Sequence, residues 1–91
     1  MDRLSKKIHY EGRVQGVGFR YTVRRIASGF EISGTIQNLS DGRVELIASG
    51  EKNELSEFLT AIRESELAGH IQKEFEETLT LTEPLKGFQI I

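Results

Sequence analysis

The chain has 91 residues, enough for one domain with a single modest core and too few for two. It lacks cysteine, which excludes disulfides, thiolate catalysis and cysteine-based zinc sites, and which is compatible with a reducing cytosol. Its net charge of −2 is divided unevenly, because residues 1–25 carry +5 and residues 26–91 carry −7. We therefore expect a single domain over residues 1–91 with its cationic part near the N-terminus.

Several classes of partner are not expected. Residues 1–7 are polar rather than signal-like, and no apolar run approaches membrane-spanning length. His9 and His70 lie far apart and lack the spacing of metal ligands. The acidic remainder of the chain argues against the basic face that nucleic-acid binding requires. We expect a cytoplasmic protein without a metal, a membrane or a nucleic-acid partner.

The first predicted elements are a strand, a glycine-rich loop and a helix. Apolar and polar residues alternate over residues 8–12, which is typical of a half-buried strand. Residues 12–20 form the loop, and an amphipathic helix begins near its end. Gly29 is expected to end this helix in a left-handed conformation. The helix is marked by apolar residues at positions i, i+3, i+4 and i+7: Val23, Ile26, Ala27 and Phe30.

A hairpin and a second helix follow. Asp41-Gly42 lies between apolar-containing runs over residues 32–38 and 43–49, a pattern that strongly favours a hairpin turn. The second helix is predicted over residues 51–65. It shows the same apolar stripe as the first: Leu55, Phe58, Leu59 and Ile62.

The C-terminal part is harder to assign. Apolar residues spaced by four within residues 70–82 also fit a helix, but the threonines there favour a strand at a sheet edge, which we predict. Residues 88–91 predict a short closing strand. The order β-α-β-β-α-β plus a terminal strand indicates an α+β, ferredoxin-like split βαβ fold, with an antiparallel sheet and both helices on one face.

The glycine-rich loop is the strongest functional signal. A loop between a strand and a helix start can present backbone N–H groups to an anion, and Arg20 adds a cation at its rim. We expect Gly16 and Gly18 to adopt positive φ or to allow close approach of a ligand. We expect the apolar residues of the loop to anchor it on the core: Val14, Val17 and Phe19.

Two other phosphate-binding patterns are excluded. The chain has no Gly-Lys followed by Ser or Thr, as a Walker A loop requires. Tyr21 occupies the place of the third glycine of a dinucleotide-binding loop. Asn38, just before the predicted turn, is either a turn residue or a functional amide at the same end of the sheet as the loop.

Two segments carry a resemblance to a known family. Residues 12–20, GRVQGVGFR, resemble the phosphate-loop signature of the acylphosphatase family, and residues 34–44, GTIQNLSDGRV, resemble its second signature. The interval between the segments, the fold plan and the length are similar as well, so the resemblance covers nearly the whole chain. It implies an enzyme that hydrolyses the carboxyl–phosphate bond of a small-molecule acyl phosphate, with no cofactor, metal or phosphoenzyme.

The resemblance also implies roles for individual residues. Arg20 would bind the phosphate, and Asn38 would orient the attacking water. A free-standing, monomeric enzyme is expected. The phosphate would be cradled by the backbone N–H groups of Gln15, Gly16, Val17, Gly18 and Phe19.

The chain departs from the family pattern at three places. Thr35 stands where the family often has Trp, and Gln37 stands where Arg is frequent. Residues 67–71 lack the proline of a Gly-Pro segment that commonly precedes the fourth strand, which questions the loop conformation there and leaves both catalytic positions intact.

There are two alternative functions, of which the sequence disfavours the first. An RNA-binding sheet needs aromatic residues on central strands, and residues 43–48 contain none. An accessory domain that binds acyl or carbamoyl phosphate without turnover is the second alternative, because the family resemblance includes the acylphosphatase-like domain of hydrogenase-maturation carbamoyltransferases. The end of the chain at Ile91, without a zinc-finger or transferase segment, favours the free-standing enzyme.

Overall fold

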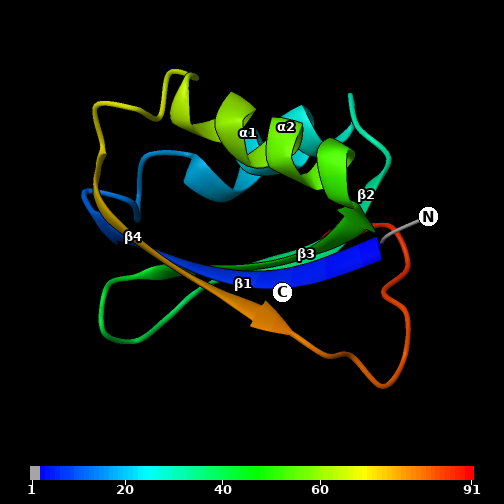
Figure 1. Cartoon of the computed structure of the whole chain (residues 1–91). Coiled ribbons are helices and arrows are strands. Elements are labelled where there is room, and N and C mark those ends of the chain that lie inside the picture. Colours follow the sequence, from blue (N-terminus) through cyan, green and yellow to red (C-terminus); the bar gives the residue numbers. More distant parts are fainter. Residues whose placement is uncertain (1–2) are drawn as a thin grey trace.

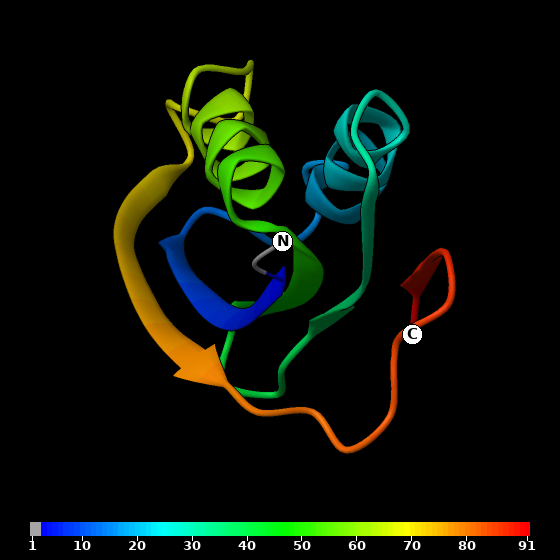
Figure 2. The ribbon, with the colours of Figure 1, turned by 45° about the vertical axis from the view of Figure 1, so that its right-hand side comes forward.

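A computed structural model describes residues 3–91 as two helices packed on one face of a five-stranded sheet (Figures 1 and 2). The strand order is β4-β1-β3-β2-β5. This architecture confirms the predicted split βαβ order with its terminal strand. The elements are β1 (Arg3–Gly12), α1 (Phe19–Ala27), β2 (Ile32–Asn38), β3 (Val44–Glu51), α2 (Lys52–Arg63), β4 (Ile71–Leu79) and β5 (Phe88–Ile90).

The sheet is mixed rather than wholly antiparallel. The predicted antiparallel arrangement holds for β4, β1, β3 and β2, whereas β5 runs parallel to β2. Residues 80–87 cause this difference, because they carry the chain from one edge of the sheet to the other, past the face away from the helices (Figure 2). β5 therefore starts at the end of the sheet where β4 stopped, and it runs in the direction of β2.

The core lies between the helices and the sheet, as the two apolar stripes predict. From α1, Val23 and Ala27 are buried, and α2 contributes all four residues of its predicted stripe. Phe58 of α2 lies at the centre of an aromatic group, with ring centroids 5.8 Å from Phe30 and 6.1 Å from Phe88. This group joins α2 and the segment that follows α1 to the edge strand β5. Within residues 3–91, neither helix has the length and apolar character needed to cross a membrane.

The predicted left-handed end of α1 at Gly29 is wrong. Gly29 does not have positive φ, and Ser28 keeps helical angles of −65° and −16°. The N–H groups of Gly29 and Phe30 instead donate to the carbonyl groups three residues earlier. The helix thus closes in a tighter turn, which satisfies its last carbonyls without a reversal of φ.

β4 is an edge strand, as predicted, and it pairs only with β1. Four of its nine residues are charged, although Phe75 is 52% exposed. Charged residues on an edge strand discourage pairing with another sheet.

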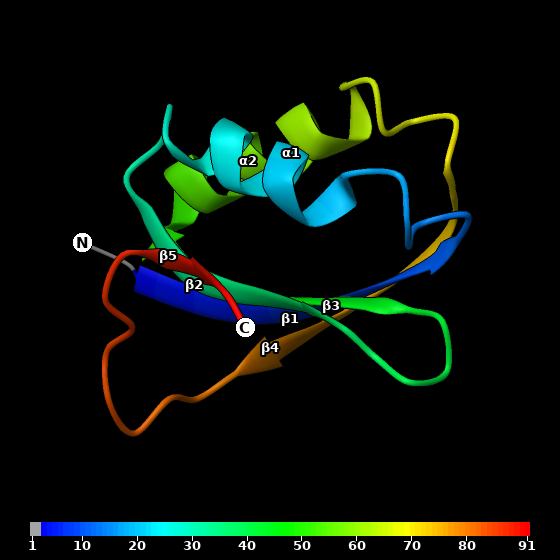
Figure 3. The ribbon, with the colours of Figure 1, turned by 180° about the vertical axis from the view of Figure 1, so that it is seen from behind.

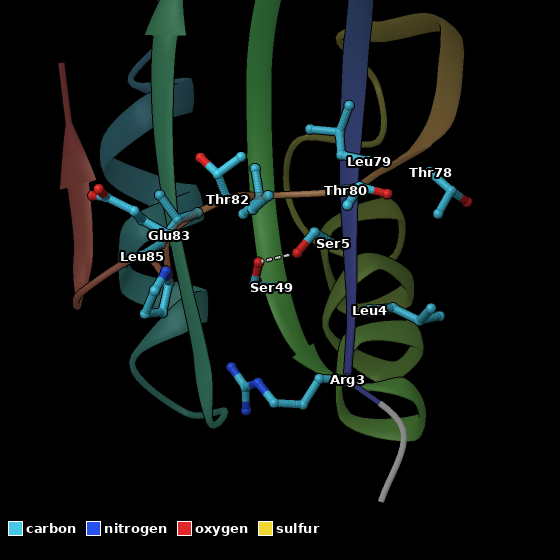
Figure 4. Close-up of a pocket in the computed structure, with 12 residues that line it drawn as sticks. Arg3, Leu4, Ser5, Ser49, Thr78, Leu79, Thr80, Thr82, Glu83 and Leu85 are labelled. Carbon is cyan, nitrogen blue, oxygen red and sulfur yellow. Dashed lines mark hydrogen bonds between the residues drawn. The ribbon is translucent and has the colours of Figure 1, made fainter.

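A hollow of about 530 Å³ lies on the face of the sheet away from the helices, where residues 80–85 pass the start of β1 (Figure 4). Ser5 and Ser49 form a hydroxyl–hydroxyl hydrogen bond of 2.5 Å at its floor. The glycine-rich loop follows the other end of β1. The hollow and the loop are therefore at opposite ends of the central strand.

Gly12, where β1 passes into the glycine-rich loop, tolerates no side chain. Its φ is +133°, and a Cβ there would lie 2.3 Å from the carbonyl oxygen of His70. We expect Gly12→Ala to lower the free energy of unfolding by about 3 kcal/mol or more, because backbone strain and a clash with backbone add together. Urea unfolding measures this change.

Gly42→Ala is the matched control, because Gly42 also has positive φ (+96°) but no atom within 4 Å of the added Cβ. The free energy of unfolding of this variant should fall by about 1 kcal/mol, because only the φ strain acts there. Equal losses for the two variants would contradict the predicted clash with His70.

Candidate functional site

In the structure the glycine-rich loop is shorter than predicted, because β1 extends to Gly12 and α1 begins at Phe19. The loop therefore spans residues 13–18, and it is anchored at both ends. Val14 and the following Phe19 are buried, as predicted, and the Arg13 N–H donates to the carbonyl of His70 over 3.0 Å. The predicted anchoring by Val17 is wrong, because its side chain is 39% exposed. Val17 lies between two glycines of positive φ at the tip of the loop, where the backbone turns away from the core.

The tip of the loop presents unpaired N–H groups. Gly16 and Gly18 have φ of 76° and 75°, which confirms the predicted positive φ. Gly18 is the N-cap of α1; no side chain caps this end, and the first turn contains no acidic residue. Within the part of the chain that the structure describes, no backbone N–H from residues 15–18 donates to a protein acceptor. These donors and the positive end of the helix dipole favour an anion.

Arg20 is the second residue of α1 and lies beside these donors in the sequence. Its side chain is partly exposed, and it forms no ion pair with any residue from 3 to 91. Other arginines are paired: Arg25 with Glu66 and Arg63 with Glu74. The Arg20 guanidinium therefore keeps its donors for a ligand.

Asn38 is the last residue of β2, and its side chain does not serve the hairpin turn. Asp41 does so: its Oδ1 accepts from the Arg43 N–H over 3.1 Å, and this bond holds the pKa of Asp41 below its ordinary value. Gly42, with φ of 96°, completes the turn. By contrast, Oδ1 of Asn38 is buried and accepts no hydrogen bond from residues 3–91. A buried acceptor without a partner in the protein is a strong indication of a ligand or water contact.

A side-chain contact connects the loop with this hairpin. Nε2 of Gln15 donates to the carbonyl oxygens of Leu39 (2.8 Å) and Arg43 (2.9 Å). Figures 1 and 3 both show the loop and the hairpin at the same end of the sheet. Sequence reasoning assigned only the backbone of Gln15 to the site. The partners of its side chain lie 24 and 28 residues away, so no local pattern indicates them.

The segment before β4 is ordered without the proline of the family pattern. Leu67 is buried, and the His70 carbonyl accepts from the Arg13 N–H at the base of the loop. The departure at residues 67–71 is therefore compatible with a well-anchored glycine-rich loop.

The charged groups near the site form pairs rather than metal clusters. His9 contacts Glu45 over 3.0 Å on the face of the sheet away from the helices. Burial acts to raise the pKa of Glu45, but hydrogen bonds from His9 and Gln37 outweigh it and lower that pKa. Among residues 3–91, no group of three or more His, Cys, Asp or Glu side chains could hold a metal ion. The absence of a metal from the reaction stays a prediction.

Three comparisons place the chain among known proteins. A family model described as Acylphosphatase matches residues 6–90. An acylphosphatase of Lacticaseibacillus paracasei is 48% identical over 63 residues, which are 69% of this chain and 68% of the relative. The crystal structure of acylphosphatase from Bacillus subtilis has a TM-score of 0.87 at 34% identity and covers 97% of this chain and 98% of that one.

A further structural likeness concerns part of a larger protein. Full-length HypF, in a phosphate- and nucleotide-bound form, has a TM-score of 0.88 at 28% identity over 99% of this chain but only 12% of its own. The likeness to the Bacillus subtilis acylphosphatase, by contrast, extends over nearly the whole of both chains. With the family model matched over residues 6–90, this chain belongs to the acylphosphatase family.

Proposed function

We propose that the reaction of this family, hydrolysis of an acyl phosphate to a carboxylate and inorganic phosphate, takes place between the glycine-rich loop and the β2–β3 hairpin. The observation that carries this proposal is the buried, unpaired Oδ1 of Asn38. Asn38 lies at the same end of the sheet as the loop that carries the unpaired N–H groups of residues 15–18. Donors for a phosphate and an acceptor for a water thus occur together.

The loop and Arg20 would bind the phosphoryl group. A transferred phosphoryl group spreads negative charge over its equatorial oxygens, so catalysis consists mainly of positioning and electrostatic stabilisation. Fixed N–H donors from residues 15–19 stabilise that charge without reorganisation. The Arg20 fork adds two charge-assisted hydrogen bonds of defined direction.

Asn38 would orient the attacking water. Its Oδ1 accepts one water O–H, which directs a water lone pair at phosphorus opposite the acyl oxygen. The new P–O bond forms as the bond between phosphorus and the acyl oxygen breaks, and the carboxylate leaves. An amide cannot take up a proton at neutral pH, so a water proton passes to a phosphoryl oxygen of the substrate. The products are a carboxylate and dihydrogen phosphate.

We further infer a cytoplasmic monomer without a nucleic-acid or membrane partner. The lack of cysteine is compatible with a reducing compartment. The charged residues of β4 disfavour pairing of sheet edges. Binding of acyl or carbamoyl phosphate without turnover is the less favoured alternative, because the relatives that match over most of their length are acylphosphatases.

Arg20→Ala should weaken binding of inorganic phosphate by roughly ten- to a hundredfold, because two charge-assisted hydrogen bonds are lost. Isothermal titration calorimetry with inorganic phosphate measures this loss. Arg24→Ala is the control of equal charge, since Arg24 lies on the same helix with its guanidinium 5.3 Å from the Tyr21 ring centroid. Equal weakening in both variants would show that general charge, rather than Arg20 itself, attracts phosphate.

Asn38→Ala should lower kcat for benzoyl phosphate by about a hundredfold or more, because the attacking water loses its orientation. Phosphate affinity should change little, since the cradle and Arg20 stay in place. Asn53→Ala, on the exposed start of α2, should leave both quantities unchanged. A parallel loss of turnover and phosphate affinity in Asn38→Ala would instead indicate a structural role for this residue.

Removal of divalent metal should not affect the reaction. We expect equal rates of benzoyl phosphate hydrolysis before and after dialysis against EDTA, because the N–H cradle and Arg20 supply the positive field that a metal would otherwise provide. Loss of activity on dialysis, with recovery on addition of one divalent metal, would refute the metal-free mechanism.

A further inference from the structure

The Gln15 side chain contacts one particular part of the hairpin. Its two acceptors, the carbonyls of Leu39 and Arg43, are neighbours in sequence of Asn38 and Val44, which face each other as the last registered pair of β2 and β3. The Arg43 carbonyl also accepts from the Leu39 N–H over 2.8 Å. The Gln15 side chain therefore binds to the backbone of the hairpin immediately beyond the pair that contains Asn38.

Within residues 3–91, this amide is the only group whose hydrogen bonds connect residues 13–18 with residues 39–43. The other anchors of the loop lead elsewhere. Val14 and Phe19 pack into the core, and the Arg13 N–H bonds to the segment before β4. None of these anchors relates the phosphate cradle directly to the hairpin that carries Asn38.

We propose that the Gln15 side chain is a positioning residue that sets the separation between the phosphate cradle and the Asn38 amide. This role rests on the proposed function, because it concerns the alignment of water with phosphorus. Gln15 is exposed, so its two hydrogen bonds contribute modestly to stability. Their effect on rate is larger, because a displacement of about 1 Å between reacting groups costs up to roughly a hundredfold.

Gln15→Met tests this role, because it keeps the length of the side chain and removes the donor without adding charge. We expect kcat for benzoyl phosphate to fall roughly ten- to a hundredfold. Affinity for inorganic phosphate, measured by calorimetry, should stay within about twofold of the wild type, because the backbone cradle remains. Gln89→Met is the matched control: Gln89 is exposed on β5, forms no side-chain hydrogen bond within the described residues, and should be neutral.

The same substitution on the Asn38→Ala background separates positioning from simple loop stability. A residue that only aligns Asn38 has nothing to align there, so Gln15→Met should cause no further loss of kcat. An equal fold-loss in both backgrounds, or a fall in phosphate affinity that matches the fall in kcat, overturns the positioning role.

The outcomes distinguish this inference from the proposed function. If the wild type hydrolyses benzoyl phosphate and Asn38→Ala is slow, while Gln15→Met retains full kcat, the positioning role is wrong and the proposed function stands. If the wild type does not hydrolyse benzoyl phosphate, the proposed function fails and the positioning role fails with it.

Discussion

The register of the three central strands is the constraint on which the site depends. Tyr10 of β1 pairs with Val44 of β3, and Val44 pairs with Asn38 of β2. One row across the sheet therefore contains the last part of β1 and the end of β2. The glycine-rich loop, which follows β1, must start at the end of the sheet where Asn38 lies. A shift of one residue in this register would turn Asn38 to the opposite face.

Packing beneath the loop extends this constraint to the start of α1. The Tyr10 ring lies 5.1 Å from the Phe19 ring, and both residues are buried. Burial of the Tyr10 hydroxyl raises its pKa, so the group stays neutral within the core. Phe19 is the first residue of α1 and directly precedes Arg20. This aromatic contact therefore fixes the start of the helix and the backbone position from which the Arg20 side chain extends. Core packing is thus connected to the proposed phosphate site through two adjacent residues.

Most of the fold follows from local patterns, whereas some contacts do not. The stripe through Leu55 and Ile62 predicts α2, and Asp41-Gly42 predicts the hairpin, because each signal lies within one element. The direction of β5 depends on the path of residues 80–87, which tertiary packing decides. The φ of Gly29 and the exposure of Val17 also depend on neighbours outside the local pattern. Residue types and spacing therefore suggest Arg20 and Asn38, but not the long-range bonds of Gln15.

The proposed site requires phosphate to bind at the tip of the loop beside Asn38. Titration of ¹⁵N-labelled protein with inorganic phosphate, followed by NMR, tests it most directly. We expect the largest shifts at the backbone amides of residues 15–20, with a smaller response at the end of β2. Largest shifts around the hollow between residues 78–85 and the start of β1, with none in the loop, would contradict phosphate binding there.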